Sequence, residues 1–297
     1  MTLVTVLMPV YNGERYLREA IESILCQTYP YFEFLIVNDN SSDSSEAIIQ
    51  SYTDDRIRYL KNEENLGITK TLNNTIPQCQ GKLIARMDCD DIAHRERIEK
   101  QVAFLKKNLD VAMVGSWYVV RNTYTHKDTV VKRHIEDEAI RFHMLFRNQF
   151  LHPGIMIRTG ILKKMYYQDV STCEDYDLFV RVMHRHKVAN LPEILMLYRW
   201  HGTNISLVNQ PQLRRSMIDI ISRLLTKYEV EHTSEELLLQ VMVALALPRE
   251  HFIQSGKLQP LHKWFEKLCT SKSMIRRFGK EQLRSGIVEY HQIYELN

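Results

Sequence analysis

The sequence lacks the features that define several large classes of protein. Its five cysteines are scattered along 297 residues and form no C-x-x-C pair, so we expect neither a disulfide framework nor a zinc site. No apolar run approaches the roughly 20 residues that span a bilayer. The first segment, MTLVTVLMPV, has no basic leader and no small-residue cleavage site. These absences favour reduced thiols and a cytoplasmic location.

A large excess of charge of one sign is also missing. The formal net charge is +3, and residues 1–210 carry 26 basic and 26 acidic side chains, so the surplus lies beyond residue 210. This balance argues against nucleic acid as a partner. The segment 257–284 combines eight Lys or Arg with Trp264, Phe265 and Phe278. It either contacts an anionic membrane peripherally, at the inner face of the plasma membrane, or packs as a helical appendage with a solvated basic face.

The glycine-rich loops that usually hold phosphates are absent. The chain contains neither G-x-x-x-x-G-K-[S/T] nor G-x-G-x-x-G after its first strand-like segment. The second absence disfavours a nicotinamide-dependent dehydrogenase. The segment PVYNGER also fits poorly the glycine-rich, basic loop that a nucleotidyltransferase would need. The negative charge of any bound phosphate would therefore have to be neutralised by groups other than a glycine-rich loop.

Strand and helix signals alternate in the first half of the chain. Apolar β-rich runs at 3–10, 32–37, 57–60, 82–87 and 111–120 alternate with helix-periodic segments at 13–27, 46–52, 67–78 and 95–108. This alternation predicts an α/β fold with a mostly parallel central sheet flanked by helices. Residues 121–210 are less regular. We expect a catalytic domain over 1–210 and a helical C-terminal region over 211–297, including a helix that opens with a capping box at Thr233 and Glu236.

Polar residues follow three of the predicted strands. They are PVYN at 9–12, NDNSSD at 38–43 and DCDD at 88–91. Because ligands of such sheets bind beyond the carboxyl ends of the strands, we expect these three segments to form one site.

The residues alone allow three interpretations of the carboxylates Asp88, Asp90 and Asp91. They can cap the next helix, form a solvated turn, or hold a divalent cation. Capping uses one Asp or two and leaves the third without a role. Asp39 could read the edge of a base, and Tyr11 could flank that base. Together with the missing phosphate loops, this pattern suggests a nucleoside diphosphate that is bound through a metal ion.

Five segments, taken together and in order, resemble a known family. They are VTVLMPVYNGERYLREAIESILCQTYPYFEFLIVNDNSSD, NLGITKTLN, GKLIARMDCDDI, CEDYDLFVR and LYRWH. Over residues 3–205 the chain resembles the family 2 glycosyltransferases of the GT-A fold, which in bacteria commonly extend surface glycans. The resemblance implies Mn²⁺- or Mg²⁺-dependent inverting transfer from a nucleotide-sugar, with a UDP-sugar favoured, to a saccharide or lipid-linked acceptor in polysaccharide or lipopolysaccharide biosynthesis. The alternatives are a catalytically inactive nucleotide-sugar-binding module and another nucleotide-sugar enzyme, such as a nucleotidyltransferase.

The resemblance also implies roles for individual residues. Asp175 would be the base, with Glu174 positioning the acceptor or tuning that base. Metal ligands would be Asp90, Asp88 and His201. The remaining matched positions would line the nucleotide pocket: Pro9, Val10, Tyr11, Asn12, Glu14, Asp39, Asn65, Gly67, Arg86 and Asp88.

Some positions depart from the family pattern or have a simpler interpretation. Leu72 stands where a cation is common, which puts the phosphate contacts in doubt. From the residues alone, Glu174 and Asp175 could simply begin a helix favourably for its dipole. We expect His152 to be a structural hydrogen-bonding residue.

Overall fold

The computed structural model describes residues 1–170, 172–202 and 210–295. These residues form two compact units, each with its own core. Among the described residues, the first contains 1–135, 150–169 and 177–202, and the second contains 136–149, 170, 172–176 and 210–295. The predicted boundary at 210/211 adjoins residues 203–209, which lie outside the described part of the chain.

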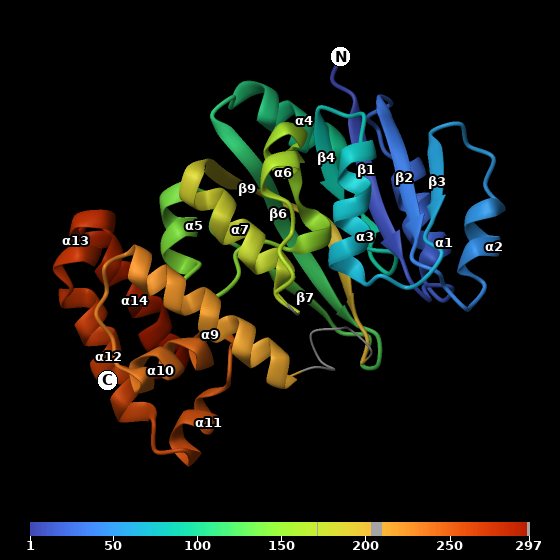
Figure 1. Ribbon diagram of the computed structural model, residues 1–297. Helices are drawn as coiled ribbons and strands as arrows, with labels where there is room; N and C mark the ends of the chain where they lie inside the picture. The colour runs from blue at the N-terminus through green and yellow to red at the C-terminus, as the bar shows by residue number, and fades with distance from the viewer. Residues whose placement is uncertain (171, 203–209, 296–297) are drawn as a thin grey trace. The chain divides into compact units, whose positions relative to one another are not determined.

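The first unit is built on a nine-stranded sheet with the order β3-β2-β1-β4-β8-β6-β9-β5, in which β7 pairs with β6. The pairs β1–β2, β1–β4, β2–β3 and β6–β9 are parallel, and strands β1 to β4 lie beside one another in Figure 1. Strand β8 runs antiparallel to both β4 and β6, β5 runs antiparallel to β9, and β7 runs antiparallel to β6. Since β1, β2, β3, β4, β6 and β9 share one direction and β5, β7 and β8 run against them, the prediction of a mostly parallel sheet is confirmed. The strands are β1 Val4–Val10, β2 Phe32–Asn38, β3 Ile57–Lys61, β4 Leu83–Arg86, β5 Ile92–Ala93, β6 Val111–Asn122, β7 Asp128–Val131, β8 Met156–Arg158 and β9 Lys187–Trp200.

Helices cover the sheet of the first unit. Its central strands are therefore buried, and they are rich in apolar residues. Every residue of β1 and β2 is buried, as expected of strands that are covered on both faces. The helices and 3₁₀ turns are α1 Leu17–Leu25, α2 Ser45–Gln50, α3 Ile68–Thr75, η1 Ile76–Gln78, α4 Arg97–Lys107, η2 His152–Gly154, α6 Thr159–Met165 and α7 Glu174–Arg185, whose first three residues belong to the second unit.

The region that looked irregular in the sequence contains the longest strand, β9. Its register with β6 passes from Ser116 opposite Leu191 to Trp117 opposite Ile194, so Pro192 and Glu193 form a bulge. Proline has no N–H to donate to a ladder and is tolerated in a sheet at such irregularities. The bulge interrupts the alternation of apolar residues and hides the strand from pattern analysis.

The second unit is helical. It contains α5 Asp137–His143, α9 Gln210–Lys227, α10 Ser234–Ala244, α11 Arg249–Gln254, α12 Leu258–Thr270, α13 Lys272–Phe278 and α14 Lys280–Tyr294. The capping box predicted at Thr233 and Glu236 is present at the start of α10. These helices make up most of residues 211–297, the region predicted to be helical.

An aromatic core explains why residues 136–149 belong to the second unit and not to the domain predicted for them. Phe146 stacks on Tyr290 of α14 at 4.1 Å between ring centroids. Phe142 packs on Phe278 of α13 at 5.5 Å. A Cβ on Gly286 would lie 2.3 Å from the Phe142 ring, so this close approach requires glycine. The partners of these rings lie more than 120 residues away in the chain, where no local pattern reveals them.

The same core absorbs the apolar residues that suggested membrane contact. Trp264, Phe265 and Phe278 are all buried within the second unit, so they are not available to enter a lipid surface. The cations Arg277, Lys280 and Arg284 remain exposed. No helix in the described residues is both long and apolar enough to cross a bilayer.

Candidate functional site

The loops that follow β1 and β2 are joined by hydrogen bonds between side chains and backbone. The Ser42 N–H donates to Asn12 Oδ1 at 2.8 Å. The Glu14 N–H donates to Asp43 Oδ2, and the Ser44 N–H donates to Glu14 Oε2, both at 2.9 Å. Asn12 has a φ of 50°, a conformation that asparagine tolerates better than most residues. Asn12 and Glu14, both predicted to line the nucleotide pocket, thus hold the two loops together.

The other predicted residues of the first loop differ in exposure. Pro9 and Val10 lie inside β1 and are buried, and the Val10 carbonyl accepts a hydrogen bond from the Asp39 N–H at 2.8 Å. Tyr11 is 52% exposed. Of these three side chains, the Tyr11 ring is the one that a ligand can reach.

Asp39 organises the loop after β3. Its Oδ1 accepts from Asn62 Nδ2 at 2.7 Å and from the Leu66 N–H at 2.9 Å, and its Oδ2 accepts from the Gly67 N–H at 2.9 Å. Gly67 has a φ of 77° and directly precedes α3. Asn65, in the same loop, is exposed. Since a carboxylate has about four acceptor positions, Asp39 keeps roughly one for a ligand N–H.

Three carboxylates gather after β4, as the sequence indicated. Asp88, Asp90 and Asp91 each place an oxygen within 4.8 Å of the others. The side chains of Asp88 and Asp90 are 27% and 25% exposed, whereas Asp91 is fully buried. Burial, followed by repulsion from the neighbouring carboxylates, raises the pKa of Asp91 well above its usual range. Burial also raises the pKa of Asp88, although the Arg86 charge opposes this.

Two arginines hold these carboxylates in place. Arg86, on β4 and 2% exposed, forms an ion pair with Asp88. The backbone N–H of Arg199 donates to Asp91 Oδ1 at 2.9 Å, and its guanidinium donates to the Asp90 carbonyl at 2.8 Å and to Glu19 Oε2 at 2.6 Å. Because Arg199 is 5% exposed, its interactions tie the end of β9 to the acidic segment.

His201 joins the cluster from the residue that follows β9. Its Nε2 lies 2.8 Å from Asp90 Oδ2, and its ring centroid lies 5.4 Å from that of Tyr16. Antiparallel pairing of β5 with β9, in which Ile92 lies opposite Leu197, brings these distant segments together. The predicted metal ligands Asp88, Asp90 and His201 are therefore neighbours in the folded chain.

The acidic cluster meets the chemical requirements of a divalent cation. Carboxylate oxygens are the preferred ligands of Mg²⁺ and suit Mn²⁺, and imidazole is a ligand of many transition metals. Asp91 Oδ2 is buried and has no hydrogen-bond partner among the described residues, which is costly for a carboxylate in a protein interior. A cation beside these groups would offset that cost.

Arg97 was not identified from the sequence, although it lies beneath this site. It is fully buried on α4, and its guanidinium donates to the carbonyl of Arg86 at 2.6 Å and to that of Ile155 at 3.2 Å. Burial and the nearby Arg86 charge lower its pKa to about 9, so it remains protonated at neutral pH. Arg97 stands on the buried face of α4 together with Ile98 and Leu105. A charged residue among apolar residues at helical spacing was the signal that could have identified it.

Glu174 and Asp175 lie at the start of α7, in the part of that helix that belongs to the second unit. Asn148 Nδ2 donates to Asp175 Oδ2 at 3.3 Å, and the Tyr176 N–H donates to Asp175 Oδ1 at 2.7 Å. Both acidic side chains are half-buried. A half-buried carboxylate that is oriented by an amide side chain fits a proton acceptor as well as it fits a helix start.

His152 and Leu72 have structural surroundings. His152 Nε2 lies 2.8 Å from the Tyr167 hydroxyl, and burial lowers the pKa of the imidazole well below its usual value. Leu72 is fully buried and packs in the core. The prediction of a structural His152 agrees with this environment.

Comparison with known proteins defines the class to which this fold and site belong. The model of "Glycosyl transferase family 2" matches residues 5–168, which is more than half of the chain. The protein belongs to glycosyl transferase family 2 and is a glycosyltransferase, as the resemblance implied.

Two curated relatives illustrate the family. A glycosyltransferase of Methanocaldococcus jannaschii is 36% identical over 66% of this chain and 70% of its own length. The second is a UDP-Glc:alpha-D-GlcNAc-diphosphoundecaprenol beta-1,3-glucosyltransferase, WfgD of Escherichia coli. It is 28% identical over 72% of this chain and 83% of its own length.

Solved structures confirm the GT-A fold. TarS of S. aureus, in complex with UDP-GlcNAc, has a TM-score of 0.66 at 16% identity and covers 98% of this chain and 92% of its own. The mannosyltransferase PcManGT from Pyrobaculum calidifontis, in complex with GDP-Man and Mn²⁺, has a TM-score of 0.57 at 14% identity and covers 99% of this chain and 88% of its own.

Proposed function

We propose that this glycosyltransferase transfers a sugar from a nucleotide-diphosphate sugar, with a UDP-sugar favoured, in a metal-dependent reaction that inverts the anomeric centre. One observation carries the proposal. Three carboxylates lie within 4.8 Å of one another at the ligand-binding edge of the sheet, and Asp91 Oδ2 among them has no hydrogen-bond partner in the described residues.

Asp88, Asp90 and His201 would hold Mn²⁺ or Mg²⁺. The bound ion would supply Lewis acidity that stabilises negative charge on the departing diphosphate. Asp91 has one oxygen bonded to the Arg199 backbone and would support the site from below. Arg86 would keep Asp88 ionised and oriented.

The nucleotide would occupy the loops after β1, β2 and β3. The exposed Tyr11 ring would stack on the base, and the remaining acceptor position of Asp39 would take the imide N–H of uracil. A uracil presents such a donor, so this contact fits UDP. TarS, a structural neighbour, is seen with UDP-GlcNAc, in accord with this choice.

Asp175 would be the base. As the acceptor oxygen forms its bond to the anomeric carbon, the bond from that carbon to the diphosphate oxygen breaks, and the acceptor proton passes to an Asp175 carboxylate oxygen. Asn148, which donates to Asp175 Oδ2, would help to orient this carboxylate. Glu174 would help to position the acceptor.

A saccharide or lipid-linked acceptor in polysaccharide or lipopolysaccharide biosynthesis fits the E. coli relative, whose name specifies a diphosphoundecaprenol-linked substrate. Such an acceptor would place the enzyme in the cytoplasm, at the inner face of the membrane. With its aromatic residues buried, the C-terminal region would contribute through exposed cations such as Arg277, Lys280 and Arg284, at about 1 kcal/mol each on an anionic surface.

The test measures UDP affinity by calorimetry with and without Mn²⁺ or Mg²⁺, and then metal-dependent release of UDP from a panel of UDP-, dTDP- and GDP-sugars. We expect the ion to tighten UDP binding and one donor to be cleaved or transferred. UDP affinity that is indifferent to both ions would exclude the metal site. Binding without turnover of any donor would favour an inactive binding module instead.

The base is tested by Asp175→Asn, with Asp169→Asn, an exposed carboxylate on the same stretch of chain, as the matched control. Loss of a general base typically lowers the rate by about 10²–10⁴-fold, with donor affinity unchanged because the nucleotide loops are untouched. Near-normal turnover by Asp175→Asn would remove the assignment.

A further inference from the structure

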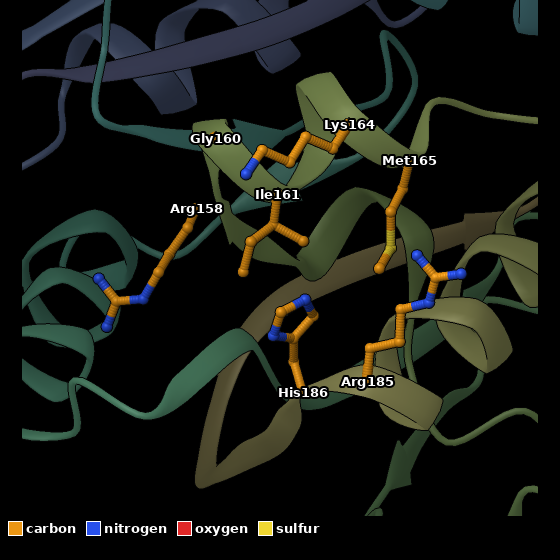
Figure 2. A pocket seen from close by; sticks show the side chains of 7 residues that line it. All are labelled: Arg158, Gly160, Ile161, Lys164, Met165, Arg185 and His186. Carbon is orange, nitrogen blue, oxygen red and sulfur yellow. The ribbon is translucent and has the colours of Figure 1, made fainter.

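A pocket in the first unit is remote from the carboxylate cluster. Its volume is about 430 Å³, and its walls include Arg158 at the end of β8, Ile161, Lys164 and Met165 of α6, and Arg185 and His186 at the end of α7. In Figure 2 Ile161 and His186 face one another at the centre, and Arg158 and Arg185 lie on either side. The pocket volume lies within the range of small-molecule sites.

The pocket and the acidic cluster lie at opposite ends of the strands. Arg158 pairs with Leu83, where β4 begins, and Lys187, the residue after His186, begins β9. Arg199, which contacts Asp90 and Asp91, is close to the other end of this 14-residue strand. The acidic cluster begins at Asp88, five residues beyond Leu83, which corresponds to about 17 Å of extended chain. The pocket is therefore separate from any donor or metal at the cluster.

The positive charges of this pocket are only partly offset by the described residues. Lys164 and Arg185 are exposed and make no hydrogen bond or ion pair within the described ranges. The Arg158 guanidinium donates to the carbonyls of Leu105 and Val111, each at 2.8 Å, which fixes its position. The pKa of Asp110 is lowered chiefly by Lys187, with which it pairs at 2.8 Å, and in smaller part by the charge of Arg158, so this carboxylate is shared. No carboxylate lines the pocket.

The helix ends do not cancel these charges. The C-terminal ends of α6 and α7 each carry roughly half a negative charge, against three full positive charges on Arg158, Lys164 and Arg185. The arrangement is also fixed, because Arg181 binds Asp177 at 2.7 Å and donates to the carbonyls of Met165 and Tyr166, each at 2.8 Å. These bonds hold the end of α6 against α7.

From this geometry we propose that the pocket binds a phosphate-bearing anion with a small apolar or neutral portion. Phosphate accepts charge-assisted hydrogen bonds from arginine and lysine, and Ile161 and Met165 offer apolar contact beside them. The phosphate belongs either to a free phosphomonoester or to an anionic phospholipid headgroup. This site is independent of the proposed sugar transfer and of its metal.

The experiment records amide shifts of residues 158–165 and 185–186 by NMR in full-length protein without divalent cations. The probes are inorganic phosphate and glycerol 3-phosphate, and in a separate arm co-sedimentation with vesicles of phosphatidylglycerol and phosphatidylcholine in equal parts is compared with phosphatidylcholine alone. Saturable shifts with a free phosphate identify a soluble ligand. Binding confined to phosphatidylglycerol vesicles identifies a headgroup.

The variant Lys164→Glu/Arg185→Glu is expected to weaken the binding at least tenfold, and salt should weaken binding to the parent protein. The matched control is Lys127→Glu/Lys132→Glu, which makes the same change of charge on exposed residues that flank β7 and should bind as the parent does. The proposal is overturned if no probe binds, or if both double variants bind like the parent. Circular dichroism of both variants checks that the fold is kept.

Discussion

Adjacent segments at the ligand-binding edge of the sheet satisfy their polar groups in different ways. In the loops after β1 and β2, the side chains of Asn12 and Asp39 have hydrogen-bond partners on neighbouring loops. The segment after β4 is not complete, since the buried Asp91 Oδ2 has no hydrogen-bond partner in the described chain. Polar networks in a protein interior are costly when only partly satisfied. The difference accords with our proposal, in which the first region is a preformed scaffold and the second would bind a positively charged ligand.

The two arginines beside the acidic cluster neutralise only part of its charge, because in the described part of the chain only one of them pairs with a carboxylate of the cluster. The Arg86 guanidinium pairs with Asp88, and the Arg199 guanidinium pairs with Glu19. Asp91 is held through the backbone N–H of Arg199, which supplies a dipole in place of a full charge. A divalent cation would supply the missing charge, and the following predictions use this contrast between scaffold and site.

The largest effect is expected for Asp90→Ala. Metal stabilisation of a transition state is worth several kcal/mol, so we expect kcat/KM to fall by about a thousandfold and UDP affinity to lose its dependence on Mn²⁺. The measurements are steady-state kinetics and calorimetry. Asp55→Ala removes an exposed carboxylate before β3 and should change neither quantity. If the Asp90→Ala enzyme kept the metal dependence of the parent, the acidic cluster would not be the metal site.

A smaller effect, on stability, is expected for Asp39→Asn. The amide has one acceptor oxygen and places an NH₂ group against an N–H of the 62–67 loop, so the free energy of unfolding should fall by about 2 kcal/mol. Urea denaturation measures this change. The response of thermal stability to Mn²⁺ should persist, because the acidic cluster is intact. If the response to Mn²⁺ disappeared, metal binding would depend on the loops around Asp39 as well as on the acidic cluster.

The pH dependence of metal stabilisation sharpens the comparison further. Because the pKa of Asp91 is raised in the folded protein, its contribution to stability without metal is full below the usual pKa of about 3.9. It is lost as pH rises through the raised pKa. Metal binding requires the carboxylates to be ionised. The rise in Tm on adding Mn²⁺ should therefore be larger at about pH 8 than at about pH 5, and an equal rise at both pH values would contradict the assignment.

The smallest effect is expected at Asn12, where two variants separate hydrogen bonding from backbone strain. Asn12→Gly removes the bond from the Ser42 N–H but accepts the positive φ, whereas Asn12→Ala must also bear that conformation. We expect losses of about 1 kcal/mol for glycine and about 1 kcal/mol more for alanine, measured by urea denaturation. Equal stabilities of the two variants would show that the loop relaxes.

Much of the first unit followed from local patterns. Continuous apolar runs identified β1, β2 and β4, because strands covered on both faces contain few polar residues. The turn residues after each run then located the polar segments, and the rule for ligand sites in parallel sheets brought Asp39, Asp88 and Asp90 to one edge. Each of these inferences uses residues that are close together in the chain.

The remaining features depend on pairing across long distances. The bulge at Pro192 concealed β9, so the sequence pattern alone did not place Arg199 beside Asp91, and the rings of Phe142 and Phe146 found their partners beyond residue 260. The basic pocket likewise joins Arg158 to Arg185. Periodicity along a chain is set by the geometry of one helix or strand, so it can be read from neighbouring residues. Which faces meet is set by register and close packing, and these exist once the chain has folded.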